Sequence, residues 1–177
     1  MSAQHITLPF TGRDLAGLRA GQRLYVSGTL YTARDQAHKR LAEALKLGKR
    51  PPFDLKTAVI YYCGPTKTPK GKRIGSCGPT TSCRMDAFTP ALLDAGLKAM
   101  IGKGNRSENV LARMKKRKAV YFLTYAGCGA LLAKQVVALK AVAYKDLGPE
   151  AVYRLTVKDF PLIVGVDTKG RNVYGKD

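Results

Sequence analysis

The stretch AMIGKGNRSENVLARMKKRKAVYFLT (Ala99–Thr124) passes from a short apolar run through a glycine-rich turn into a basic, amphipathic segment, and then returns to an apolar run. The two apolar runs have the composition of buried strands, and the segment between them has the length and spacing of a helix that reaches about Lys118. A strand, a turn, a helix and a second strand in this order favour an α/β domain.

The same alternation continues on both sides of this stretch. Residues 23–30 alternate as a strand, and 33–47 place Ala37 and Leu41 on one helical face that ends at Gly48. Further elements are predicted as strands at 58–62 and 141–144, a helix after Gly129, and a hairpin of 162–166 with 172–174. No repeat, low-complexity tract or linker interrupts the pattern, so we expect one α/β domain with a mixed sheet over residues 1–177.

Cationic side chains lie at three predicted strand-to-helix turns. Arg34 follows the strand at 23–30, Lys103 and Arg106 follow the strand at 99–101, and Arg84 follows a junction at 73–81. At this last junction Pro79, beside two threonines, is a helix-start signal.

Helix N-termini carry free N–H groups and bind carboxylates or phosphates, and strand-to-helix turns gather at the carboxyl edge of a sheet. The pattern therefore predicts a site for a compact dianion or trianion. Ordinary helix capping by Thr80 and Asn105, with basic side chains at the surface, is the alternative interpretation.

The charge of the chain is strongly positive, with 31 Lys and Arg against 12 Asp and Glu, a formal net charge of +19. Nucleic-acid binding is the default interpretation of such a balance, and an anionic small substrate with an acidic partner chain is another. The basic run 115–118 lies in the last turn of its predicted helix, where cations suit the helix dipole. No aromatic residues are interleaved with it as a stacking surface requires.

The cysteines and histidines indicate what the chain lacks. Cys63, Cys77, Cys83 and Cys128 form no C-x-x-C pair, and there are two histidines, so zinc and ferredoxin spacings are absent. No Ser-His-Asp arrangement or carboxylate pair stands out. A site rich in cations and poor in acids and bases suggests an incomplete active site, in which another component supplies the electrophile. The absence of long apolar runs and of a secretory signal leads us to expect a soluble, intracellular protein.

At these junctions the sequence resembles the beta subunit, or C-terminal domain, of class I iron–sulfur fumarate hydratases and L(+)-tartrate dehydratases. The resemblance rests on several stretches that cover nearly the whole chain in order: 21–35, 37–40, 60–65, 74–82, 84–86, 100–107, 143–151 and 159–161. It implies a swivelling β/β/α-type domain. It also implies a larger alpha subunit that holds a [4Fe–4S] cluster on its own cysteines, so that this chain supplies no metal ligand.

The resemblance also implies roles for individual residues. Arg34, Arg84 and Lys103 match the residues that bind the substrate carboxylates. Thr80 matches a threonine near the carbon that exchanges a proton, and is the candidate catalytic base as well as a substrate-binding residue. His38 belongs to a matching motif, where a packing or capping role is favoured over catalysis. Cys83 departs from the pattern, because the family commonly has a small residue there.

The functional hypothesis is a beta subunit of a cytoplasmic fumarate hydratase of the tricarboxylic acid cycle. It would convert fumarate and water to L-malate in a hetero-oligomer with two copies of each subunit, without a membrane or nucleic-acid partner. L-tartrate or mesaconate as substrate remains open. A non-catalytic module that binds nucleic acid or an acidic protein is the hypothesis from a different class.

Overall fold

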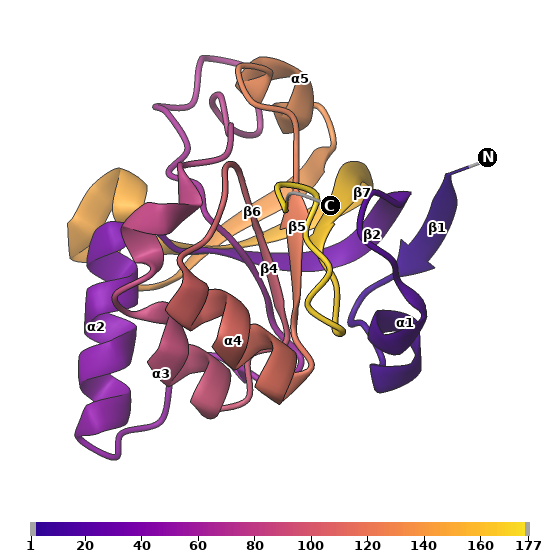
Figure 1. Ribbon diagram of the computed structural model, residues 1–177. Coiled ribbons are helices and arrows are strands. Elements are labelled where there is room, and N and C mark those ends of the chain that lie inside the picture. Colours follow the sequence, from indigo (N-terminus) through magenta and orange to yellow (C-terminus); the bar gives the residue numbers. More distant parts are fainter. Residues whose placement is uncertain (1–2, 176–177) are drawn as a thin grey trace.

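The computed structural model describes residues 3–175 of the chain (Figure 1). Its strands are β1 (Gln4–Thr7), β2 (Arg23–Thr32), β3 (Val59–Tyr61), β4 (Ala99–Gly102), β5 (Val120–Leu123), β6 (Val136–Ala143) and β7 (Val152–Val166). Its α-helices are α1 (Gly12–Gly17), α2 (Asp35–Lys46), α3 (Thr89–Asp94), α4 (Glu108–Arg117) and α5 (Gly129–Ala133), and two 3-10 helices are η1 (Ser82–Met85) and η2 (Lys145–Glu150).

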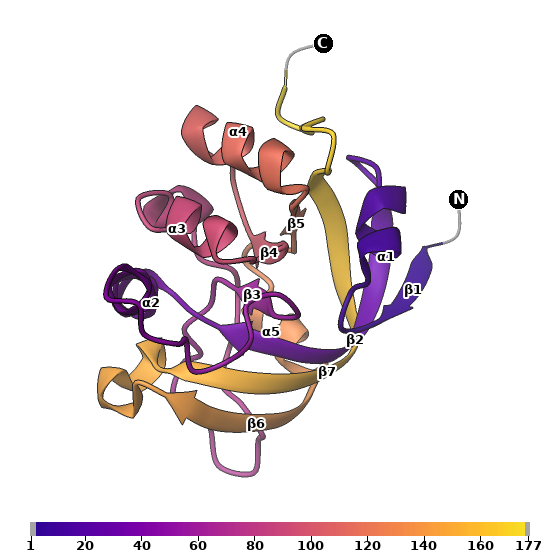
Figure 2. The same cartoon turned by 90° about the horizontal axis from the view of Figure 1, so that it is seen from below.

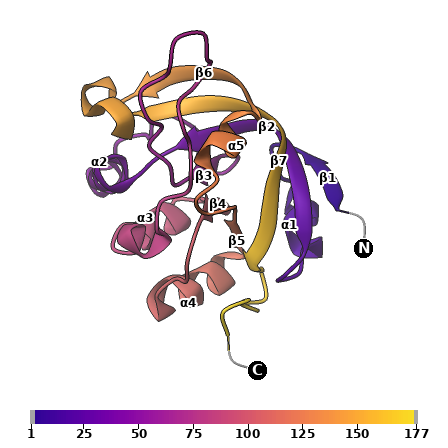
Figure 3. The ribbon, with the colours of Figure 1, turned by 90° about the horizontal axis from the view of Figure 1, so that it is seen from above.

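The strands form one mixed sheet in the order β1-β2-β3-β4-β5-β7-β6, in which β2 also pairs with β7. Strands β2 to β5 run parallel to one another, and β7 is antiparallel to β2, β5 and β6. Because β7 is 15 residues long, one of its edges follows β2 while the other reaches both β6 and β5. These pairings close β2, β3, β4, β5 and β7 into a ring (Figure 3).

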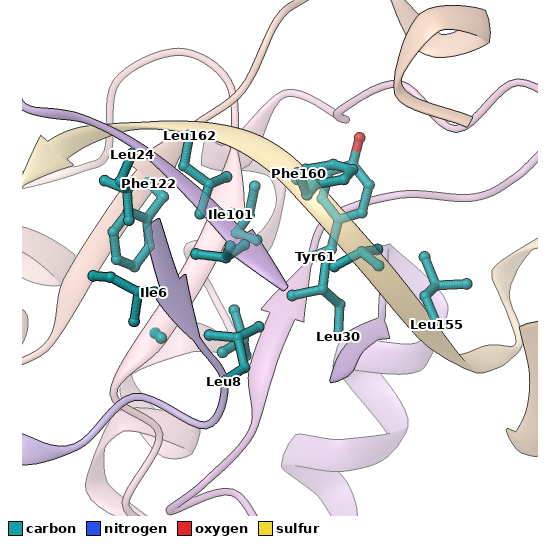
Figure 4. Packing of buried hydrophobic residues seen from close by; sticks show 14 of the residues in the cluster. Ile6, Leu8, Leu24, Leu30, Tyr61, Ile101, Phe122, Leu155, Phe160 and Leu162 are labelled. Atoms are coloured by element: carbon teal, nitrogen blue, oxygen red, sulfur yellow. The ribbon is translucent and has the colours of Figure 1, made fainter. Parts of the chain in front are cut away.

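Two hydrophobic clusters lie on opposite faces of the short parallel strands, because successive side chains of a strand alternate between faces. Val59 and Tyr61 point into the first cluster, between these strands and β2 and β7, and Ile60 and Tyr62 point into the second. Figure 4 shows the first cluster, in which Tyr61 meets residues of β2 and β7. The second cluster lies under α2, α3 and α4, which form a row outside the parallel strands (Figure 2).

The structure confirms the α/β class with a mixed sheet, and most elements lie where the sequence predicts them. The helix expected at 33–47 is α2, and its buried residues include Ala37 and Leu41. The helix that carries the basic run 115–118 in its last turn is α4, which ends at Arg117 and is followed by Lys118 in the left-handed conformation with φ 52°. Among residues 3–175, no helix is long and apolar enough to span a membrane.

The predictions for two segments were wrong. Neither the strand nor the α-helix of the junction at 73–81 forms: residues 73–80 are irregular, and the four-residue η1 follows from Ser82. The C-terminal hairpin is reduced to a turn with a single bridge between Val166 and Asn172. Residues 162–166 instead end the long strand β7, whose pairing with β2 depends on residues more than a hundred positions away.

Candidate functional site

The candidate site lies at the carboxyl ends of the parallel strands, the end that carries α5 in Figure 1. Backbone hydrogen bonds continue past these ends, from Ala33 N to Tyr61 O at 3.0 Å and from Tyr62 N to Ile101 O at 2.8 Å. The chain then makes a long excursion over residues 63–79 and returns to the same edge. There Thr80 N donates to Tyr62 O at 2.6 Å.

Ser82 fixes the returning segment against β4. Its amide donates to Lys103 O at 2.9 Å, and its hydroxyl accepts from Lys103 N at 3.1 Å and bonds the Tyr121 hydroxyl at 2.7 Å. A Cβ on Gly102 would lie 2.0 Å from the Ser82 Oγ, so this close approach requires glycine. The structure therefore brings the backbones of Arg34, Thr80 and Lys103 to one edge of the sheet.

Arg84 reaches the same edge through its side chain. Its Nε and Nη2 donate to the two carboxylate oxygens of Asp35, each at 2.9 Å. The Nε of Arg34 lies 3.6 Å from Oδ2 of the same Asp35 carboxylate. Asp35 thus joins two of the predicted cations, one at the start of α2 and one on η1.

The Arg34 guanidinium is held loosely. Its Nε is buried and has no hydrogen-bond partner among residues 3–175, and its Nη2 lies 3.8 Å from Glu150. Both of its ion pairs are longer than a hydrogen bond, so the side chain is oriented but keeps unused donors. A Cβ on Gly64 would lie 2.7 Å from the Arg34 Cδ, so glycine at this position gives the arginine room.

Thr80 does not lie at a helix N-terminus, which corrects the sequence-based expectation. The 3-10 helix η1 begins two residues later, so a helix dipole does not support a negative charge on the Thr80 hydroxyl. Asn105 does not cap α4 either. Its side-chain oxygen accepts from Arg106 N and from Asn172.

Arg106 belongs to the core and not to the anion site. Its side chain is 0% exposed, and its Nε donates to Asp86 at 2.7 Å. The guanidinium also donates to Thr89 and lies between the rings of Tyr62 and Tyr121, at 5.2 and 5.1 Å from their centroids. Sequence reasoning grouped Arg106 with Lys103, but Arg106 is buried in the core, whereas Lys103 is half-buried at the edge of the sheet.

His38 is buried on the sheet-facing side of α2, in agreement with a packing role. Its Nδ1 lies 3.0 Å from the backbone oxygen of Arg34, and its ring packs edge-on against Tyr62. Burial lowers the pKa of His38 from 6.5 to about 4, so the ring is neutral near pH 7. His38 thus supports the backbone of a candidate site residue.

The donor set of this chain does not fit an iron–sulfur cluster. Cys63 and Cys77 are buried, and the hydrogen bond between their thiols raises the pKa of Cys63 and lowers that of Cys77. Cys83 and Cys128 are exposed. Within the described part of the chain, no three His, Cys, Asp or Glu side chains come together as a metal-binding group.

Sequence reasoning missed the acids of the site. Asp35 and Glu150 both stand in the stretches that carry the family resemblance, but neither was given a role. The available signal was the position of Asp35, an acidic residue in the first turn of α2 directly after a candidate cation. Nothing in the sequence linked it to Arg84, which is 49 positions away.

Comparison with known proteins identifies relatives along almost the whole chain. Residues 2–177 match the family described as Fumarase C-terminus. Over 166 residues the chain is 39% identical to fumarate hydratase 2 of Leishmania major, and over 154 residues it is 42% identical to the anaerobic class I fumarate hydratase of Escherichia coli K12. These matches cover 93% and 86% of this chain, but 29% and 28% of the relatives.

A relative of similar length is the L(+)-tartrate dehydratase subunit beta of Escherichia coli K12. It is 38% identical over 178 residues, which cover 97% of this chain and 87% of the relative. The sequence resemblance is thereby confirmed, and the chain belongs to the fumarase C-terminus family.

Proposed function

We propose that this chain is the substrate-clamping part of a hydro-lyase that adds water to a four-carbon dicarboxylate, with fumarate and L-malate as the first candidates. The observation that carries the proposal is the meeting of two arginines at one carboxylate: Arg84 donates to both oxygens of Asp35 at 2.9 Å, and the Arg34 Nε lies 3.6 Å from Oδ2. The backbone of Thr80 returns to the same edge of the sheet. The Arg34 side chain is 24% exposed and both of its ion pairs are longer than a hydrogen bond, so its guanidinium keeps donors for a substrate carboxylate.

The substrate would contact the chain through three cations. Arg34 and Arg84 offer planar donors for a carboxylate, and Lys103 offers a point charge. Thr80 is the proposed proton-transfer residue, and cations that bind the substrate carboxylates would favour negative charge on its hydroxyl. The relatives' names support this assignment, since they are a fumarate hydratase and a tartrate dehydratase subunit.

The electrophile would come from a larger partner, because the cysteines of this chain do not fit a cluster. We propose an alpha subunit that carries the [4Fe–4S] cluster, two copies of each subunit, and a cytoplasmic enzyme of the tricarboxylic acid cycle. A bound cluster would supply Lewis acidity toward the substrate oxygens. The role of this chain is to orient both carboxylates and to place the Thr80 hydroxyl beside the reacting carbon.

The test is activity of the chain co-produced anaerobically with its larger cluster-bearing partner. Fumarate, L-malate, L-tartrate and mesaconate would be assayed in parallel, because they differ by a hydroxyl or a methyl. Arg34→Ala should lower kcat/KM roughly ten- to a hundredfold, since a charge-assisted hydrogen bond contributes about 1.5–3 kcal/mol.

Arg117→Ala is the matched control. Arg117 is also an arginine paired with an aspartate, Asp94, but it lies in the last turn of α4, away from the carboxyl ends of the strands. It should leave kcat/KM unchanged. An assembled wild-type enzyme that turns over none of the four dicarboxylates would contradict the proposed function. Equal activity of Arg34→Ala and wild type would contradict the placement of the substrate.

A further inference from the structure

Asp35 joins the two arginines of the candidate site. It is the first residue of α2, and both of its oxygens accept from Arg84 at 2.9 Å while Oδ2 lies 3.6 Å from Arg34. The Asp35 side chain is 23% exposed and the Arg84 side chain 50% exposed. A half-exposed arginine on a short 3-10 helix is therefore tied to the rigid start of a twelve-residue helix.

The bidentate pair determines which donors Arg84 can offer. Its Nε and one Nη2 proton are occupied by Asp35, and the remaining N–H groups of the planar guanidinium face away from that carboxylate. The negative charge also offsets the repulsion between Arg34 and Arg84, which permits the two guanidinium groups to stay close. Without Asp35, the long Arg84 side chain would sample many rotamers.

We propose that Asp35 is a positioning residue for the hydro-lyase reaction: it orients Arg84 and sets the spacing between Arg84 and Arg34. The proposal rests on the proposed function and adds a residue that does not itself touch the substrate. It predicts that loss of Asp35 lowers kcat without raising KM, because Asp35 and a dicarboxylate substrate are both negatively charged and Asp35 therefore does not help the substrate to bind.

Asp35→Asn should lower kcat about ten- to a hundredfold without raising KM. Loss of alignment slows the chemical step, since small misplacements of a catalytic group are costly. Removal of a negative charge beside the site favours binding of a dianion, so ground-state affinity does not fall. A merely structural role would lower the amount of assembled enzyme, and the kcat of each assembled enzyme would stay at the wild-type value.

Asp35→Glu separates positioning from a structural role of the charge. The glutamate keeps a carboxylate in the first turn of α2, where its negative charge interacts favourably with the helix dipole. Its side chain is one methylene longer, so the carboxylate moves relative to Arg84. The proposal predicts a loss of kcat in Asp35→Glu as well. A structural role of the charge predicts wild-type kinetics.

A double-mutant cycle tests whether Asp35 acts through Arg84. Arg84→Lys keeps the charge and loses the planar fork, so it should lower kcat/KM by itself. If Asp35 acts through the orientation of Arg84, adding Asp35→Asn to Arg84→Lys should lower kcat less than twofold further. Additive losses would overturn the proposal.

Asp94→Asn is the matched control, because Asp94 also joins two arginines, Arg113 and Arg117, at a surface position. It should leave kcat and KM unchanged. All variants would be measured in the assembled enzyme, with assembly checked by size-exclusion chromatography. Wild-type kcat in Asp35→Asn, or failure of that variant to assemble while Asp94→Asn assembles, would overturn the positioning role. An inactive wild type would instead refute the proposed function.

Discussion

The buried ion pair between Arg106 and Asp86 should make the protein sensitive to the loss of one partner. Replacing both partners together by apolar side chains should cost less than removing Asp86 alone. The Arg106 side chain is 0% exposed and that of Asp86 is 11% exposed, and their closest atoms are 2.7 Å apart. Asp86→Leu would leave the guanidinium in the core without a counter-charge. Breaking a buried pair in this way costs about 3–5 kcal/mol.

The reciprocal change should cost less. Arg106→Met leaves the Asp86 carboxylate near the surface, where it still accepts from Ser107 N at 2.6 Å. It also leaves the hydroxyl of Thr89 bonded to Met85 O at 2.8 Å, so few polar groups lose all of their partners. We therefore expect Arg106→Met to be less destabilising than Asp86→Leu.

The double variant Asp86→Leu with Arg106→Met is the decisive measurement. Apolar side chains of similar volume can replace a buried pair at little cost, because two charges no longer need to be desolvated. The double variant should thus be more stable than Asp86→Leu alone. Urea denaturation measures the free energies of unfolding, and thermal denaturation should show the Asp86→Leu midpoint lowered by about 6–20 °C.

The exposed ion pair of Asp94 is the control for this experiment. Asp94→Leu removes an aspartate from two arginines at a position that is 38% exposed, and should cost less than about 1 kcal/mol. A double variant as destabilised as the sum of the two single variants would refute the reasoning. So would an Asp86→Leu variant within about 1 kcal/mol of the wild type.

Three further predictions follow from the structure. Because the folded pKa of His38 is about 4 against 6.5 in the unfolded chain, its contribution to stability is present above pH 6.5 and lost as pH falls toward 4. Urea denaturation should show a loss of roughly 2 kcal/mol from this residue between pH 7.5 and pH 5, absent in His38→Gln; an equal pH dependence in both proteins would exclude His38 as its source. Gly64→Ala should displace Arg34 and raise the KM for the dicarboxylate several-fold, whereas Gly12→Ala, with nothing within 4 Å of the added Cβ, should not; an unchanged KM in Gly64→Ala would contradict the position of Arg34. Duplex DNA should bind no tighter than about 10⁻⁴–10⁻⁶ M at moderate salt in fluorescence anisotropy, and sequence-specific binding a thousandfold tighter would favour a nucleic-acid module.

The sequence by itself determined the family, the α/β class and most of the elements. Short apolar runs predicted strands β3, β4 and β5, and the spacing of Ala37 and Leu41 predicted α2. These signals are local, since they depend on the alternation of side chains along one element. The same local signals placed cations after the strands β2 and β4, and parallel strands bring such positions to one edge.

The tertiary structure decided what lies between those elements. The pairing of β7 with β2 and β5, the return of residues 79–82 to the sheet edge, and the burial of Arg106 all depend on contacts between distant parts of the chain. Arg106 and Lys103 are three positions apart in one turn, yet one lies in the core and the other at the edge. Composition cannot separate them, because the partner that permits a buried guanidinium, Asp86, is supplied by a different segment.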